Sequence, residues 1–160
     1  MNNLLAIESS FNSCSVAIKL ENNKIISDFQ ISNKNYHALL LSMIDKLIKK
    51  HDFSLYNCNA ILSSIGPGNF TGLRISTIIC KTLAFYYNIP IYPISSLALI
   101  SQNIIKQKEI PQKTKILVAM DAKMNELYFG IYQKDASCVK SLYIYSIISN
   151  NFIIFDKIFL

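Results

Sequence analysis

The stretch Ile65-Gly66-Pro67-Gly68-Asn69-Phe70-Thr71-Gly72-Leu73-Arg74 decides how this chain is interpreted, because it holds three of the four glycines and the only arginine of the 160 residues. The apolar segment Ala60–Ile65 leads into it, and an apolar helical pattern follows it as far as Tyr87. A strand, a glycine-rich turn and a helix in this order point backbone N–H groups and a helix N-terminus at a ligand or a partner. An ordinary tight turn between a strand and a helix is the alternative.

The glycine spacing excludes two well-known phosphate-binding loops. No Gly-Lys-Ser/Thr follows, so the stretch is not a Walker loop, and Gly66, Gly68 and Gly72 read G-x-G-x-x-x-G, which is not the Rossmann spacing. Glycine is favoured where φ is positive or where another backbone passes closely. We therefore expect Gly68 and Gly72 to hold such positions, and Arg74 to fix the loop or to reach a partner through its planar donor group.

Composition indicates a cytoplasmic globular protein. Hydrophobic residues make up 51% and charged residues 16% of the chain, which allows a sizeable core. The net charge of +6 comes from scattered lysines that form a solvated surface or attract a polyanion such as tRNA weakly. No apolar run reaches the ~18 residues of a spanning helix, so we expect no membrane association. Widely spaced cysteines without a CxxC pair predict buried free thiols: Cys14, Cys58, Cys80 and Cys138.

Apolar periodicity predicts the order of helices and strands. Short apolar or alternating runs predict strands at Asn3–Glu8, Ser13–Leu20, Ile25–Ile31, Asn59–Ile65, Ile89–Ile94, Lys115–Asp121, Glu126–Gln133 and Cys138–Ser146. Helical spacing predicts helices over Tyr36–Lys50, over Phe70–Tyr87, and from Ser95 or Ser96 to about Gln107. One short element is expected in Ile147–Leu160.

The two ends of the chain repeat a pattern. Ala6-Ile7-Glu8 matches Ala119-Met120-Asp121, and each is followed by two further strands. The repeat predicts a duplicated α/β fold, with a complete first domain over residues 1–108 and an incomplete second domain over residues 109–160.

The helix that follows the glycines is apolar nearly all round. A helix on one face of a sheet needs only one apolar stripe, so another helix or another chain must cover the surplus. The helix Tyr36–Lys50 can cover part of it, and burial within one chain is the alternative to a partner. Interface candidates, on both helices, are Leu39, Met43, Leu47, Ile78, Thr82, Phe85 and Tyr86.

Several segments resemble the TsaB/TsaD family in order and spacing. They are the opening Leu5–Ser10 with Cys14–Ala17, the specific glycine stretch Ile65–Ile75, and the segments Ile89–Leu97 and Met120–Tyr128, which together span roughly residues 3–135. The resemblance implies an α/β fold of the actin/Hsp70-like (ASKHA) class. It also implies a part in making threonylcarbamoyladenosine, the modified base beside the anticodon of ANN-decoding tRNAs.

The resemblance favours the TsaB branch. The transferase of the family, TsaD, carries an HxxxH metal motif on the helix that corresponds to Ser95–Ser101, which holds no histidine here. His37 and His51 would lie about 20 Å apart on one continuous helix, too far to share a metal ion. The resemblance therefore implies an accessory subunit without catalytic residues, metal or cofactor. Such a subunit pairs with TsaD, is joined by the ATPase TsaE and meets tRNA through the complex. From the two apolar helices we also expect a homodimer when the chain is alone.

The sequence departs from the TsaB pattern at Glu8, where an aspartate is usual, and at Ser76, where a glycine is common. A vestigial nucleotide cleft would use Glu8, Ser9 and Asp121. An ATP-binding ASKHA phosphotransferase remains an alternative, although the turns after both acids lack glycine. A metallopeptidase, which the missing HxxxH disfavours, a tRNA-binding module and a remnant without activity are the others.

Overall fold

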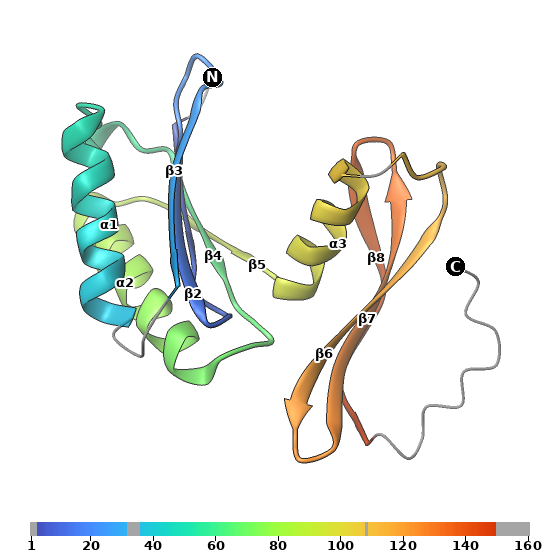
Figure 1. The fold of residues 1–160 in the computed structure, drawn as a ribbon. Coiled ribbons are helices and arrows are strands. Elements are labelled where there is room, and N and C mark those ends of the chain that lie inside the picture. Colours follow the sequence, from blue (N-terminus) through green and yellow to red (C-terminus); the bar gives the residue numbers. More distant parts are fainter. Residues whose placement is uncertain (1–2, 32–35, 108, 150–160) are drawn as a thin grey trace. The chain divides into compact units, whose positions relative to one another are not determined.

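The computed structural model describes residues 3–31, 36–107 and 109–149 (Figure 1). The chain divides into two compact units, Met1–Ser96 and Leu97–Leu160. This division lies before the boundary that the sequence predicts at residue 108. The reason is that the helix beginning at Ser96 buries its apolar side within the second unit, so it groups with the strands that follow it.

A five-stranded sheet forms the centre of the first unit, in the order β3-β2-β1-β4-β5. The first three strands form an antiparallel meander, whereas β4 and β5 continue the sheet in parallel with β1. Alternation of apolar and small residues places every second side chain of β1 and β2 in the core. The strands are β1 (Leu4–Glu8), β2 (Ser13–Lys19), β3 (Ile25–Ile31), β4 (Ala60–Ser64) and β5 (Ile91–Ile94).

Two helices, α1 (Tyr36–Lys50) and α2 (Phe70–Tyr87), cover one face of this sheet, as Figure 1 shows. A short 3-10 helix, η1 (Leu55–Asn57), lies between α1 and β4. The Asn69 side chain caps α2 by accepting a hydrogen bond from the Gly72 N–H, and Asn88 ends the helix in the left-handed conformation. The core between helices and sheet includes Leu5, Ile7, Val16, Ile18, Leu40, Met43, Ile61 and Cys80.

The second unit combines α3 (Ser96–Gln107) with the antiparallel sheet β6-β7-β8. Its strands are β6 (Lys115–Lys123), β7 (Glu126–Asp135) and β8 (Cys138–Ser149). Leu97 and Ile105 of α3 share a small core with Ile116, Val118 and Tyr132 of the sheet.

The predicted helices and strands are confirmed to within a few residues at their ends. β8 continues to Ser149, beyond the predicted end at Ser146. The predicted element in Ile147–Leu160 therefore begins as part of β8, and residues 150–160 lie outside the described residues. None of the helices in the described part of the chain is both long and apolar enough to cross a membrane.

The four cysteines, all within the described residues, form no disulfide, and three of them, Cys14, Cys58 and Cys80, are buried. Burial raises the pKa of the Cys58 and Cys80 thiols, which disfavours the reactive thiolate, whereas Cys138 is exposed. We expect a thiol reagent at pH 8 to modify Cys138 rapidly in the folded chain and the other three only after denaturation. Mass spectrometry of the modified peptides measures this, and rapid labelling of Cys80 without denaturant would contradict the packing of α2 on the sheet.

Candidate functional site

The glycine loop between β4 and α2 is hydrogen-bonded to the two residues that follow β1 and to Ser96, the last residue of the first unit. The Asn69 N–H donates to the Ser10 carbonyl oxygen at 2.6 Å, and the Ser9 hydroxyl donates to the Gly72 carbonyl oxygen at 2.8 Å. On the other side, the Ser96 N–H donates to the Gly66 carbonyl oxygen at 2.8 Å. The loop thus joins three segments that are far apart in the sequence.

Two glycines of the loop stand where the backbone that follows β1 passes closely. A Cβ on Gly68 would overlap the Ser10 carbonyl oxygen, and a Cβ on Gly72 would overlap the carbonyl oxygen of Ser9. Gly66 meets a different demand, since its φ of +94° is one that side chains rarely adopt. Glycine is therefore needed at these positions to let α2 begin directly on the end of the sheet.

Two amides in the first turn of α2 are engaged within the chain. The Gly72 N–H donates to the Asn69 side chain at 3.0 Å, and the Leu73 N–H donates to the Asn69 carbonyl oxygen at 2.9 Å. These donors are consequently not directed at an external anion, as they are in phosphate-binding loops. The geometry of the loop favours a packing role over a ligand cradle.

Glu8 ends β1 beside this loop, and one of its carboxylate oxygens, Oε1, accepts from both the N–H and the hydroxyl of Ser10. The Ser96 hydroxyl in turn donates to the Ser10 hydroxyl oxygen at 2.9 Å. Glu8 and Ser9 belong to the first unit and Asp121 to the second, so the vestigial nucleotide cleft stays a prediction. Asp121 is exposed, and the hydrogen bond from the Lys123 N–H at 2.8 Å lowers the pKa of its carboxyl group.

One side of α2 is exposed and partly apolar; we call it the outer face of α2. The Phe85 side chain is 91% exposed, and the guanidinium carbon of Arg74 lies 4.4 Å from the centre of the Phe70 ring, a cation–π contact. Arg74 forms no ion pair with any of the residues described. The outer face comprises Phe70, Thr71, Arg74, Ile78, Lys81, Thr82, Phe85 and Tyr86.

The structure corrects the predicted interface on α1. Met43 is 0% exposed and Leu47 is also buried, while Leu39 is half-buried against the same core. These side chains lie on the stripe of α1 that packs toward the sheet and α2, so they are not available to a partner. Ile78, Thr82, Phe85 and Tyr86 are exposed, so the alternative in which α2 is wholly buried is wrong.

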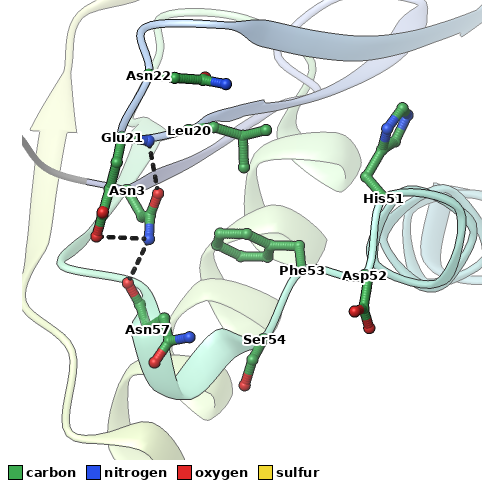
Figure 2. A pocket seen from close by; sticks show the side chains of 9 residues that line it. All are labelled: Asn3, Leu20, Glu21, Asn22, His51, Asp52, Phe53, Ser54 and Asn57. Atoms are coloured by element: carbon green, nitrogen blue, oxygen red, sulfur yellow. Dashed lines mark hydrogen bonds between the residues drawn. The ribbon is translucent and has the colours of Figure 1, made fainter.

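A pocket of about 350 Å³ lies beside the start of β1, and Figure 2 shows the side chains that line it. Asn3 organises it: the side-chain amide donates to the Asn57 carbonyl oxygen at 3.0 Å, and its oxygen accepts from the Glu21 N–H at 2.9 Å. The sequence analysis did not identify this role of Asn3, although a polar residue directly before an apolar strand was a usable signal. The remaining walls are Leu20, Asn22, His51, Asp52, Phe53 and Ser54.

The pocket residues do not assemble a metal centre. Within the described ranges, no group of three or more His, Cys, Asp or Glu side chains is placed to hold a metal ion. Because the Asn3 side chain is hydrogen-bonded on both its nitrogen and its oxygen, it acts as a structural link between β1, the β2–β3 turn and η1.

The chain is similar to proteins that are named for a tRNA modification. It is 35% identical over 133 residues to the tRNA threonylcarbamoyladenosine biosynthesis protein TsaB of Buchnera aphidicola subsp. Schizaphis graminum, covering 82% of this chain and 61% of that protein. It is 33% identical over 127 residues to TsaB of Haemophilus influenzae, covering 79% of this chain and 52% of that protein. The chain thus spans between half and two thirds of the length of these curated relatives.

A solved structure, YeaZ from Pseudomonas aeruginosa, matches with a TM-score of 0.85 at 29% identity, over 92% of this chain and 68% of that one. The predicted α/β fold of the actin/Hsp70-like class is thereby confirmed. A family model, TsaD, described as tRNA N6-adenosine threonylcarbamoyltransferase, matches residues 22–153. Since that match covers most of the sequence, the chain belongs to the TsaD family, within which it is similar to the proteins named TsaB.

Proposed function

We propose that this chain is an accessory subunit in the formation of threonylcarbamoyladenosine on tRNA, and that it pairs with a TsaD-type transferase through the outer face of α2. The similarity to proteins named for this biosynthesis supports the reaction. The exposure of Phe85 and its neighbours on α2 is the observation that carries the pairing.

Physical reasoning supports a partner on this face. Exposed aromatic residues in one helical stripe leave apolar surface in water, and aromatic residues and arginine are enriched at protein interfaces. Arg74, held over Phe70, is pre-ordered to meet a carboxylate or an aromatic ring of a partner. The two basic side chains of the face, Arg74 and Lys81, favour a partner whose matching surface is acidic or neutral.

The proposed accessory role also means that another subunit carries out the transfer reaction. The segment Ser95–Ser101 contains no histidine to supply the metal motif that the resemblance assigns to TsaD, and the Glu8 carboxylate is engaged by Ser10. The chain would contribute a surface to the complex, with transfer carried out by TsaD, ATP hydrolysis by TsaE, and tRNA bound by the assembly. A homodimer through the same face would form when TsaD is lacking.

Phe85→Asp tests the pairing. A charge at this 91% exposed position should leave folding intact, because aspartate is solvated there, but it would be desolvated on binding. We expect binding to the cognate TsaD to weaken by about 2–4 kcal/mol, the range of interface hot spots. Isothermal titration calorimetry with purified TsaD measures this, alongside a melting curve of the variant.

Phe29→Asp provides a matched control, because Phe29 is 65% exposed on β3, away from both helices. It should leave the affinity unchanged. Equal binding by Phe85→Asp and the wild-type chain would reject the outer face of α2 as the interface. Failure of the wild-type chain to bind any form of TsaD would favour the inactive remnant, and threonylcarbamoyl transfer by this chain alone would overturn the accessory role.

A further inference from the structure

Two buried polar atoms of the described residues lack a hydrogen-bond partner: Glu8 Oε2 and Ser64 Oγ. Ser64 is only 2% exposed, so its hydroxyl cannot turn to bulk solvent. Buried polar groups in proteins are nearly always hydrogen-bonded, and each exception requires an explanation. Two such atoms at the ends of neighbouring strands indicate a common cause.

The strand register places both atoms on one face of the sheet. β1 and β4 run in parallel, with Ala6 beside Leu62 and Ile7 beside Ser63, so Glu8 and Ser64 follow as the next pair. Ser63 faces the helices, since Ile61, two residues earlier on β4, belongs to the core that α1 and α2 cover. Because side chains alternate along a strand, Ser64 and Glu8 lie on the opposite face.

The other carboxylate oxygen of Glu8, Oε1, has hydrogen-bond partners within the chain. It accepts two hydrogen bonds from Ser10, whose carbonyl oxygen receives the Asn69 N–H of the glycine loop. No lysine, arginine or histidine in the described ranges forms an ion pair with Glu8. A shielded carboxylate oxygen without a cation requires a neutral donor close by.

We propose that one internal water molecule bridges Glu8 Oε2 and Ser64 Oγ. The water donates one hydrogen to the carboxylate oxygen and accepts the hydroxyl hydrogen of Ser64, which satisfies both atoms. Internal waters typically bind two to four otherwise unpaired polar groups, and this site supplies two. The water holds Glu8 in the orientation that fixes Ser10 and so seats the glycine loop, which makes Glu8 a positioning residue of that loop.

Nuclear magnetic resonance of the labelled wild-type chain tests the water directly. We expect nuclear Overhauser contacts between the Ser64 amide and a water molecule that stays longer than surface hydration. A crystal structure should show an ordered water within hydrogen-bond distance of both oxygens. A direct hydrogen bond between Glu8 and Ser64, with no water contact, would overturn the proposal.

A double-mutant cycle with Glu8→Gln and Ser64→Ala tests the coupling by urea unfolding. The effect of Ser64→Ala on the unfolding equilibrium constant should differ at least about fivefold between the wild-type and Glu8→Gln backgrounds, since both side chains share the water. Ser76→Ala is the matched control, because the buried Ser76 hydroxyl donates to the Leu73 carbonyl oxygen of its own helix. Its effect should agree within about twofold in the two backgrounds.

Two results of the cycle would count against the water. Additive effects of Glu8→Gln and Ser64→Ala would show that the two oxygens share no ligand. Stabilisation of the wild-type chain by potassium or sodium chloride over choline chloride, lost in Glu8→Gln, would show that a monovalent cation binds there instead. If either variant fails to fold, the water contacts in the wild-type chain decide the question.

Discussion

Gly72→Ala is expected to destabilise the first unit by about 2–3 kcal/mol, even though alanine is the better helix former. In an exposed helix interior this substitution stabilises by roughly 1 kcal/mol. Here the new methyl group would overlap the Ser9 carbonyl oxygen, which is backbone, so α2 and the end of β1 must move apart. The same movement weakens the 2.8 Å hydrogen bond from the Ser9 hydroxyl to the Gly72 carbonyl oxygen.

Urea unfolding followed by circular dichroism measures this change, with Thr71→Ala as the control. Thr71 occupies the same turn of α2 but is exposed, so its substitution should alter the free energy of unfolding by less than about 0.5 kcal/mol. The sign of the Gly72→Ala effect on the free energy of unfolding shows whether Gly72 is required by close backbone contact with Ser9 or occupies an ordinary helix position. A stabilised Gly72→Ala variant would mean that α2 does not begin in contact with β1.

Met43→Asp is expected to unfold the first unit or to destabilise it by about 3–5 kcal/mol. Met43 is 0% exposed in the core, and an aspartate there would be a buried charge without a partner. Since the free energy of unfolding of a domain is only about 5–15 kcal/mol, a loss of this size removes most of the stability of the fold.

Leu41→Asp is the matched control for Met43→Asp, because Leu41 lies on the same helix and is 53% exposed. It should fold normally, with a melting temperature within a few degrees of the wild-type value. The comparison also separates a core position from an interface position. A Met43→Asp variant that melts normally but fails to bind TsaD would restore Met43 to the interface that the sequence predicts.

The sequence by itself determined the element order and the family of this chain. Strand alternation in Ser13–Lys19 and helical spacing in Tyr36–Lys50 depend only on neighbouring residues, so they are visible without a structure. The glycine stretch also identified the family by its resemblance. Its glycines are required because a Cβ at Gly68 or Gly72 would overlap neighbouring backbone atoms. The spacing of the glycines could not show whether the group that approaches them closely is a ligand or another part of the same chain.

Only the tertiary structure decided which sides of the helices are available to a partner and which residues contact the glycine loop. The helix α2 is apolar nearly all round and α1 has one broad apolar stripe, so periodicity left open which of these side chains a partner could reach. Packing on the sheet buries Met43 and exposes Phe85. The contacts of Ser10 with Asn69 and with Ser96 join residues distant in the sequence, and no local pattern encodes them. Side chains separated in sequence meet only when the sheet brings the ends of β1 and β4 together, which is why the environment of the loop required the folded chain.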